Sequence, residues 1–296
     1  MFSKIKFVVA IIYRNIKWLL IKLFHPSNEY VKNINGYKMY ISTAKKGLDV
    51  YEASIFKQLA MDGVREFEAT KVIKQLIKPG FKIFELGANV GYYALMESKI
   101  IGETGKVYAV EPEKNNINLL KRNIKLNNAN NIEVNHMAIS DKDGEYPLYV
   151  TSSSNLHSMG KPKTRDYKTE MVQTKSVDNF LKNKGNIDMI RMDIEGYEYE
   201  ALKGMNETLK NNPNLHLFIE LHTHIIEPEK SKEMLQKLKD NGFEIMVAIT
   251  HDNHFRSILK ETTVERITID DLMKDERLLK QKCAFEIFFE KVGISN

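Results

Sequence analysis

The chain has 296 residues, of which 43% are apolar and 28% charged, and its formal net charge is +5. This length and composition indicate a globular protein with a sizeable core and exclude a disordered or fibrous one. The positive charge is mild and spread along the chain, so it falls short of the basic footprint of a nucleic-acid-binding protein. A single cysteine, Cys283, excludes a disulfide framework and a thiolate metal cluster.

Residues 1–25 are predicted to form a basic amphipathic helix. Apolar side chains such as Ile12 and Leu19 fall on one face, whereas Lys6 and Arg14 fall on the other. No apolar run reaches the ~18 residues that a membrane span requires, but such a helix is typical of segments that lie in a membrane interface. Packing against the domain or a second subunit is the alternative. We expect a cytoplasmic protein, free or held peripherally at the inner membrane surface.

The segment that follows is predicted to be a hairpin and a helix. Asn35-Gly36 between two β-rich runs is a strong signal for a two-residue hairpin loop. Residues 50–61 and 65–77 have helical patterns. We therefore divide the chain into an N-terminal appendage, 1–64, and a catalytic domain, 65–296.

The central stretch reads as a strand at 81–86, a glycine turn, a helix at 92–101 and a second strand at 106–110. In the turn, Glu85 is followed by Gly87 and Gly91, which let the backbone pass close to a ligand. The turn also aims a helix N-terminus above the sheet. Glu111 follows the second strand, where a carboxylate accepts hydrogen bonds from the two hydroxyls of a ribose.

The spacing of this turn favours one class of nucleoside. A dinucleotide fingerprint is G-x-G-x-x-G, whereas this chain has E-x-G-x-x-x-G. A carboxylate inside the turn repels a pyrophosphate but suits the cationic end of S-adenosylmethionine. An NAD-dependent oxidoreductase is therefore disfavoured, and an ordinary turn without a ligand is the remaining alternative.

The rest of the chain continues the alternation of strands and helices. We predict helices at 114–127, 177–182, 199–210 and 228–241, and strands at 132–139, 146–150, 171–175, 187–194, 215–221, 243–249 and 284–291. This series predicts an α/β fold with a mostly parallel, doubly wound sheet. Ligands of such sheets bind outside the carboxyl ends of the strands. Strand ends at Glu85, Glu111, Ala138, Asp193 and Glu220 are therefore expected to share one rim.

Several segments together carry a family resemblance: FELGANVGYY, VYAVEPEKNNINLLKRNIKLNN, AISDKDGEYPLYV, SVDNFL and IDMIRMDIEGYEYEALKGM. In this order they resemble the FkbM family of S-adenosylmethionine-dependent methyltransferases. The resemblance implies a seven-stranded Rossmann-like sheet of the class I methyltransferases. It also implies methyl transfer, mostly to oxygen and often on sugars or related glycans. The chain has Glu at position 85, where the family commonly has Asp.

The resemblance and the turn together give a set of cofactor-binding residues. They are Glu85, Gly87, Ala88, Asn89, Gly91, Tyr92, Glu111, Pro112, Ala138, Ser140 and Asp193. In the polar loop that follows the 146–150 strand, Asn155 and His157 are the candidates for contact with the acceptor, a small molecule or glycan. A solvated loop without a site role is the alternative for these two residues.

The acids near the reaction centre are the candidate catalytic residues. Asp193 is the first candidate for the general base that removes a proton from an acceptor hydroxyl, although it could instead cap the next helix. Glu195 could cap that helix or hold Arg191. Glu220 and His222 could complete an acid–base pair or a hard magnesium or manganese site with Asp193. A metal is not expected.

Two further functions remain as alternatives. A nucleic-acid methyltransferase that acts on base amino groups usually has a Pro-Pro-aromatic motif after its fourth strand, which grips a flipped base. Residues 193–196, Asp-Ile-Glu-Gly, contain no such motif. The other alternative is a cofactor-binding or membrane-tethered protein without turnover.

Overall fold

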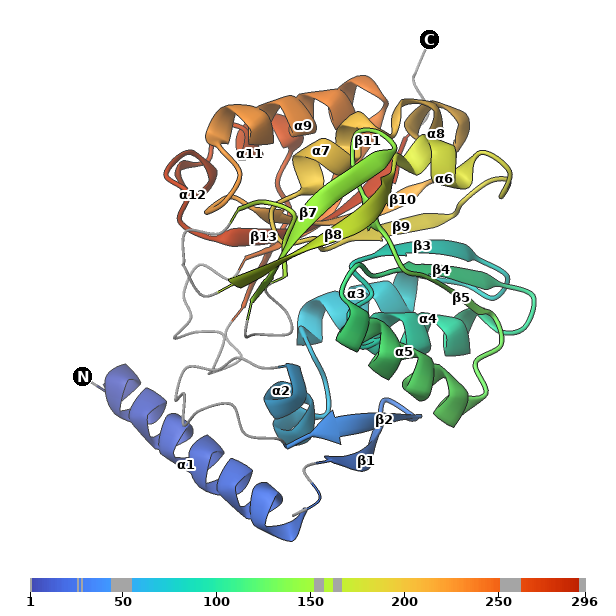
Figure 1. The fold of residues 1–296 in the computed structure, drawn as a ribbon. Helices are drawn as coiled ribbons and strands as arrows, with labels where there is room; N and C mark the ends of the chain where they lie inside the picture. Colours follow the sequence, from blue (N-terminus) through green and yellow to red (C-terminus); the bar gives the residue numbers. More distant parts are fainter. Residues whose placement is uncertain are drawn as a thin grey trace.

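The computed structural model describes residues 2–25, 27, 29–43, 55–151, 157–161, 167–250 and 262–292, with the side chains of the first helix described from residue 8. Within these residues the main sheet has eight strands (Figure 1). Their order is β12 (Thr263–Glu265), β11 (Phe243–Thr250), β13 (Ala284–Lys291), β10 (His216–His222), β9 (Met189–Met192), β3 (Lys82–Leu86), β4 (Lys106–Val110) and β5 (Ile132–Asn135). Seven of these strands match predicted ones and form the expected seven-stranded sheet, and β12 adds an eighth strand at its edge.

The direction of the strands confirms the predicted fold class. Strands β5, β4, β3, β9 and β10 are parallel, whereas β13 is antiparallel to both of its neighbours, β10 and β11. β3 is the first strand of the parallel series, and it lies between β4 and β9. This is the switch point of a doubly wound sheet, outside which ligands bind.

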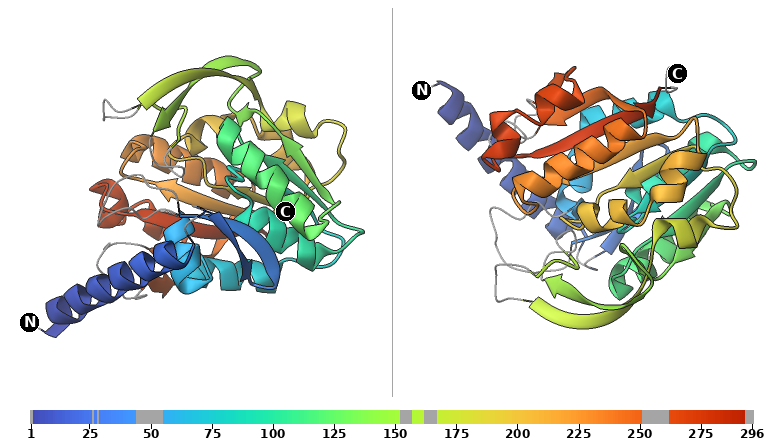
Figure 2. Two further views of the ribbon diagram at one scale, coloured as in Figure 1. Left: turned by 60° about the horizontal axis from the view of Figure 1, so that its bottom comes forward. Right: turned by 90° about the horizontal axis from the view of Figure 1, so that it is seen from above.

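Helices cover both faces of the sheet (Figures 1 and 2). On one face lie α3 (Phe67–Leu76), α4 (Tyr92–Ile101) and α5 (Lys114–Asn127), and on the other lie α6 (Val177–Leu181), α7 (Glu198–Lys203), α8 (Asn206–Asn211), α9 (Pro228–Asp240), α11 (Ile269–Leu272) and α12 (Glu276–Leu279). Each face has its own buried apolar cluster, one around Ile190 and Leu217 and the other around Ile83 and Leu95.

The N-terminal segment contains α1 (Phe2–Phe24), β1 (Glu29–Ile34), β2 (Tyr37–Ser42) and α2 (Ile55–Asp62). Positive φ angles at Asn35 and Gly36 form the predicted two-residue hairpin loop. Buried Ile34 and Leu59 belong to the same apolar cluster as Ile83. The division at residues 64 and 65 remains a proposal. None of the helices in the described ranges is long and apolar enough to cross a bilayer.

The prediction of one continuous strand at 132–139 was wrong, because this segment forms two strands in different sheets. β5 ends at Asn135, the Met137 N–H turns back to the Asn135 carbonyl, and β6 (Ala138–Ile139) pairs with β8 (Tyr167–Lys175) instead. With β7 (Gly144–Thr151), these strands form a separate three-stranded sheet. Periodicity does not reveal such a change of partner, because both strands carry the same apolar signal.

The predicted helix at 199–210 was also wrong, because it is divided into α7 and α8. The break falls at Gly204, a residue with a low helix propensity. A Cβ atom at this position would lie 2.7 Å from the Ser140 carbonyl oxygen, so the close approach requires glycine. The break therefore lets the helical segment pack closely against the end of β6.

Candidate active site

A pocket lies at the carboxyl ends of β3, β4 and β9. Its lining includes many of the predicted cofactor and catalytic residues: Glu85, Gly87, Ala88, Asn89, Tyr92, Glu111, Pro112, Ala138, Asp193, Glu195 and His157. Gly91, Ser140, Glu220 and His222 do not line it, although they lie in the elements around it. Asn155 lies outside the described residues.

The glycine turn after β3 is held close to the end of β9. Gly87 has a φ of +83°, and a Cβ atom there would lie 2.0 Å from the carbonyl oxygen of Asp193. Only glycine permits this approach. The Gly87 and Ala88 N–H groups donate to the Val110 carbonyl, which ties the turn to the end of β4.

Glu111 is fixed by two main-chain donors and the Asn116 side-chain amide rather than by a cation. Its Oε2 accepts a hydrogen bond from the Asn89 N–H at 2.8 Å, and its Oε1 accepts one from the Glu113 N–H at 2.9 Å. Burial raises the pKa of Glu111 to about 7, although these hydrogen bonds oppose the shift. A buried carboxyl group that lines the pocket at this strand end fits the ribose hydroxyls of a nucleoside.

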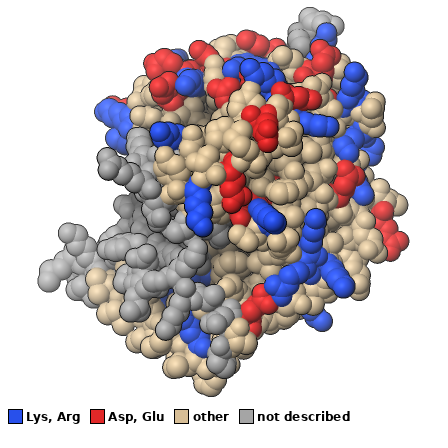
Figure 3. Space-filling model, in the orientation of Figure 1, with Lys and Arg blue, Asp and Glu red and all other residues tan. Residues whose placement is uncertain are grey.

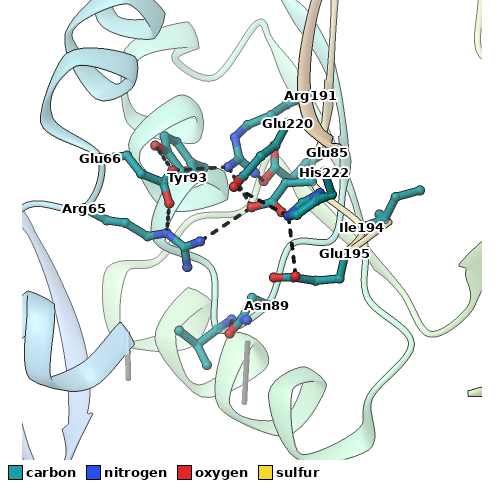
Figure 4. Close-up of polar contacts among 12 residues, drawn as sticks. Arg65, Glu66, Glu85, Asn89, Tyr93, Arg191, Ile194, Glu195, Glu220 and His222 are labelled. Carbon is teal, nitrogen blue, oxygen red and sulfur yellow. Dashed lines mark hydrogen bonds and ion pairs between the residues drawn. The ribbon is translucent and has the colours of Figure 1, made fainter. Parts of the chain in front are cut away.

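Arg191 in β9 is the centre of the buried charge network (Figure 4). Its side chain is 2% exposed, and the guanidinium lies over the rings of Tyr93 and Phe218 at 3.7 and 4.8 Å. Nη1 donates to Glu85 Oε1 at 2.9 Å, and Nη2 donates to Asp193 Oδ2 at 3.3 Å. Glu66 Oε2 also lies 3.7 Å from Nη2, so two aromatic faces and three carboxylates hold one cation in the protein interior.

Glu85 is paired within the protein although it lines the pocket. Burial raises its pKa to about 7 against the opposing charge of Arg191. Glu97 in α4 is fully buried beside it, and burial followed by the charge of Glu85 raises the pKa of Glu97 well above its ordinary value. This shift favours the uncharged form of Glu97, which limits the negative charge in this part of the core.

Asp193 is held by two arginines. In addition to Arg191, the Arg65 Nη2 atom lies 3.6 Å from Asp193 Oδ2, and Arg65 is in turn paired with Glu66. Burial acts to raise the pKa of Asp193, but the two guanidinium groups lower it below its ordinary value. Asp193 therefore stays ionised and fixed, which makes it a weak proton acceptor.

Glu195 lies in a different environment, although it is only two residues away. Its φ is +55°, an uncommon conformation for a non-glycine residue, and its carbonyl oxygen accepts a hydrogen bond from Ser158 at 2.8 Å. Its side chain is 20% exposed and faces His222 across 3.5 Å, as Figure 4 shows. Burial raises the pKa of Glu195 to about 8, against the opposing effect of His222.

His222 lies behind Glu195 and is oriented by Glu198. Its Nδ1 is 2.9 Å from Glu198 Oε1, while its Nε2 lies 3.5 Å from both Glu195 Oε2 and Glu220 Oε1. Burial alone would lower the pKa of His222, but Glu198, Glu220 and Glu195 raise it well above its ordinary value. The imidazole can therefore carry a positive charge that Glu195 faces.

Comparison with known proteins identifies the family. The profile of the Methyltransferase FkbM domain matches residues 85–245, which is more than half of the chain. The match includes the site residues described above except Arg65 and Glu66. The chain belongs to the FkbM methyltransferase family. The methyl donor of this family is S-adenosylmethionine, as predicted. The donor's sulfonium supplies an electrophilic methyl group when it is bound.

Other similarities to this FkbM methyltransferase are weaker. A probable cobalt-precorrin-6B C(15)-methyltransferase (decarboxylating) from Saccharolobus solfataricus is 35% identical over 58 residues, which span 20% of this chain and 29% of that protein. A SAM-dependent methyltransferase structure from Aquifex aeolicus shares 20% identity and has a TM-score of 0.40, with 75% of this chain and 88% of that chain covered. Fibrillarin from Aeropyrum pernix has 16% identity, a TM-score of 0.41, and coverages of 88% and 82%.

One group of side chains in the FkbM site has the spacing of a metal site. The ligand atoms of Asp193, Glu195 and His222 lie within 4.8 Å of one another. However, the guanidinium groups of Arg65 and Arg191 both lie within 3.6 Å of Asp193 Oδ2 and would repel a cation there. The prediction that no metal is needed remains a prediction.

Sequence analysis did not find two polar residues of this site, Arg65 and Glu198. Arg65 lines the pocket, and Glu66 accepts a hydrogen bond from the Tyr93 hydroxyl at 2.7 Å. Glu198 accepts hydrogen bonds from the Ile194 and Gly196 N–H groups as well as from His222. A signal for Glu198 was present, since acidic residues are favoured in the first turn of a helix, where N–H groups lack partners within the helix.

Proposed function

We propose that this FkbM protein transfers a methyl group from S-adenosylmethionine to a hydroxyl oxygen of a saccharide or a related polar metabolite. The observation that carries the proposal is the environment of Glu195. This carboxyl group lines the pocket, is backed by His222, and has a pKa raised to about 8. A general base acts best when its pKa lies near the working pH.

In this proposal the pocket residues have separate roles. Glu111 binds the ribose hydroxyls of the donor, and the turn at Gly87–Asn89 forms the wall of the pocket against which the donor packs. Glu195 would remove the proton of the acceptor hydroxyl as the carbon–oxygen bond forms and the methyl carbon–sulfur bond of the donor breaks, which leaves S-adenosylhomocysteine. Asp193, fixed by Arg65 and Arg191, orients the reacting groups, since its lowered pKa suits a positioning role. This assigns the base to Glu195 rather than to Asp193, the first candidate in the sequence.

The polar acceptor is supported by what surrounds the pocket. His157 and Ser158 lie at its wall with Glu195 and Tyr197, which offers several hydrogen-bonding groups to a hydroxyl-rich molecule. A nucleic-acid acceptor would require a large basic surface. Among the described residues on the face drawn in Figure 3, Lys and Arg side chains are intermixed with Asp and Glu and form no such surface.

The location of the protein is part of the same proposal. A cytoplasmic protein with peripheral contact at the inner membrane surface through residues 1–25 would meet polar acceptors that are assembled there. A function without turnover, as a cofactor-binding or membrane-tethered protein, is the competing proposal.

Calorimetry with S-adenosylhomocysteine tests the proposed cofactor site. We expect binding to the full chain, and at least 10-fold weaker binding to Glu111→Gln, because hydrogen bonds to a charged group contribute about 1.5–3 kcal/mol. Asp270→Asn is a matched control, since Asp270 is an exposed carboxylate paired with Lys239 far from the pocket. Binding of NAD in place of S-adenosylhomocysteine would overturn the assignment.

A further inference from the structure

The polar side of α1 faces the protein. Arg14 is bound to Asp62 at 3.0 Å, and Lys17 Nζ donates to the Met61 carbonyl oxygen at 3.2 Å. Asn15 Oδ1 accepts a hydrogen bond from Lys57 Nζ at 3.0 Å. These contacts fix the rotation of the helix against α2, which lies beside it.

The apolar side of α1 consequently faces outward. Between residues 8 and 24, every exposed side chain is aliphatic or aromatic: Val8, Val9, Ile12, Tyr13, Ile16, Leu19, Leu20, Leu23 and Phe24. Leu19 is 57% exposed and Leu23 is 67% exposed. An amphipathic helix on a globular domain normally has the opposite orientation, with its apolar stripe against the core. A contiguous exposed apolar face of this kind marks an interaction surface.

The charge of the helix indicates which partner fits this face. Residues 1–25 contain five Lys or Arg residues and no Asp or Glu. Asp62 compensates Arg14, but a second copy would still bring together two helices that carry a net positive charge, whereas anionic lipid headgroups supply the opposite charge. Trp18, whose ring lies 5.3 Å from Lys22 Nζ, packs against the apolar cluster around Ile83 and so anchors the helix on the domain rather than in the outward face.

We infer that α1 docks the protein on an anionic bilayer, with its outward apolar face in the acyl boundary. The helix has 23 residues, so it is roughly 35 Å long and lies in the plane of the membrane. The contacts of Arg14 and Lys17 with α2 set the orientation in which the domain sits above the lipid. This inference rests on the membrane location proposed above, to which it adds the orientation of the helix and the class of lipid, and it does not depend on the identity of the methyl acceptor.

Flotation with lipid vesicles tests the inference on the full chain. The probe is a vesicle of equal parts phosphatidylcholine and phosphatidylglycerol, compared with a vesicle of phosphatidylcholine alone. We expect binding to the mixed vesicles and weaker binding to the neutral ones. The double variant Leu19→Gln, Leu23→Gln should bind the mixed vesicles about 100-fold more weakly, because two leucine side chains no longer leave water.

A matched control variant changes an exposed apolar side chain outside α1. Met171 in β8 is 57% exposed, so Met171→Gln removes similar apolar surface and should leave vesicle binding unchanged. Calorimetry with S-adenosylhomocysteine on each variant checks the pocket independently of the membrane. Two results would overturn the inference: no binding of the full chain to the mixed vesicles, or a dimer in light scattering that the double variant dissociates.

Discussion

Asp193 and Glu195 are carboxylates two residues apart in one loop, and their environments are opposite. Asp193 lies against the guanidinium groups of Arg65 and Arg191, which lower its pKa. Glu195 faces the imidazole of His222, and burial raises its pKa to about 8. A permanent cation fixes the charge of the first acid, whereas the second acid faces a partner that can itself lose a proton.

The difference shows how one short loop can supply both a fixed charge and a proton acceptor. The loop places the two side chains in different directions because Glu195 has a positive φ angle and Glu198 holds the N–H groups on either side of it. The choice of counter-ion then sets the role of each acid.

Removal of the permanent cation should have the largest effect. Arg191→Met leaves Glu85 and Asp193 buried without their shared partner, and we expect the free energy of unfolding to fall by about 3–5 kcal/mol. Urea denaturation followed by circular dichroism measures this change. Arg122→Met is the control, because Arg122 is 49% exposed where it pairs with Glu29, and its loss should cost less than about 1 kcal/mol. Equal losses for the two variants would contradict this description of the cluster.

Replacement of the proposed base should remove most of the turnover. We expect Glu195→Gln to slow methyl transfer to a responsive saccharide acceptor by about 10²- to 10⁴-fold while S-adenosylhomocysteine affinity stays within a few-fold. The pH profile separates the two acids. The wild-type rate should rise as pH increases through about 8, because Glu195 must lose its proton to act as a base.

Asp193→Asn is the matched variant for that experiment. It should lower the rate but keep the rise near pH 8, since Glu195 is still present. Loss of the rise in Asp193→Asn and its retention in Glu195→Gln would assign the base to Asp193. Substantial activity in both variants would indicate an acceptor that needs no base, such as a carboxylate.

Glu111 offers a third environment, buried and without a cation. Its pKa is raised from 4.5 to about 7, which corresponds to roughly 3 kcal/mol. The folded state therefore holds its proton more tightly than the unfolded state. This contribution to stability is complete below about pH 4.5 and is lost as the pH rises through about 7. The melting temperature should fall less steeply with rising pH in Glu111→Gln than in the wild type. An equal fall in both proteins would contradict the assignment.

The smallest effect is expected for the residue that orients His222. Glu198→Gln removes the negative charge at Nδ1, so the pKa of His222 should fall and methyl transfer should slow by about 10-fold. Imidazole resonances in a nuclear magnetic resonance titration report the pKa directly. Glu200→Gln, in the same helix and paired with Lys203 at the surface, should leave the titration of His222 unaffected.

The local part of the site was predictable from the sequence. The β3–turn–α4–β4 segment has nearly the predicted bounds because its apolar runs and glycine turn are local signals. The prediction that Glu85, Glu111 and Asp193 share a rim followed from the common direction of parallel strands, and all three line the pocket.

The partners of these acids were not predictable in the same way. Arg191 and Glu85 are 106 positions apart, and their pairing depends on the register between β9 and β3. Arg65 reaches Asp193 from the segment before α3, and no periodicity in the sequence encodes that contact. The position of His222 relative to Glu198 likewise depends on how α7 packs beside β10, which is a property of the whole fold.

The short helix α2 connects the proposed membrane-binding helix α1 with the pocket. Asp62 at its last residue binds Arg14 of α1, and Ile55 at its first residue lines the pocket. Eight residues of helix span about 12 Å. On a docked protein, the length of α2 would set the distance between the pocket and the lipid headgroups. Acceptors would then be selected by how far their hydroxyl stands from the bilayer, as well as by their chemistry.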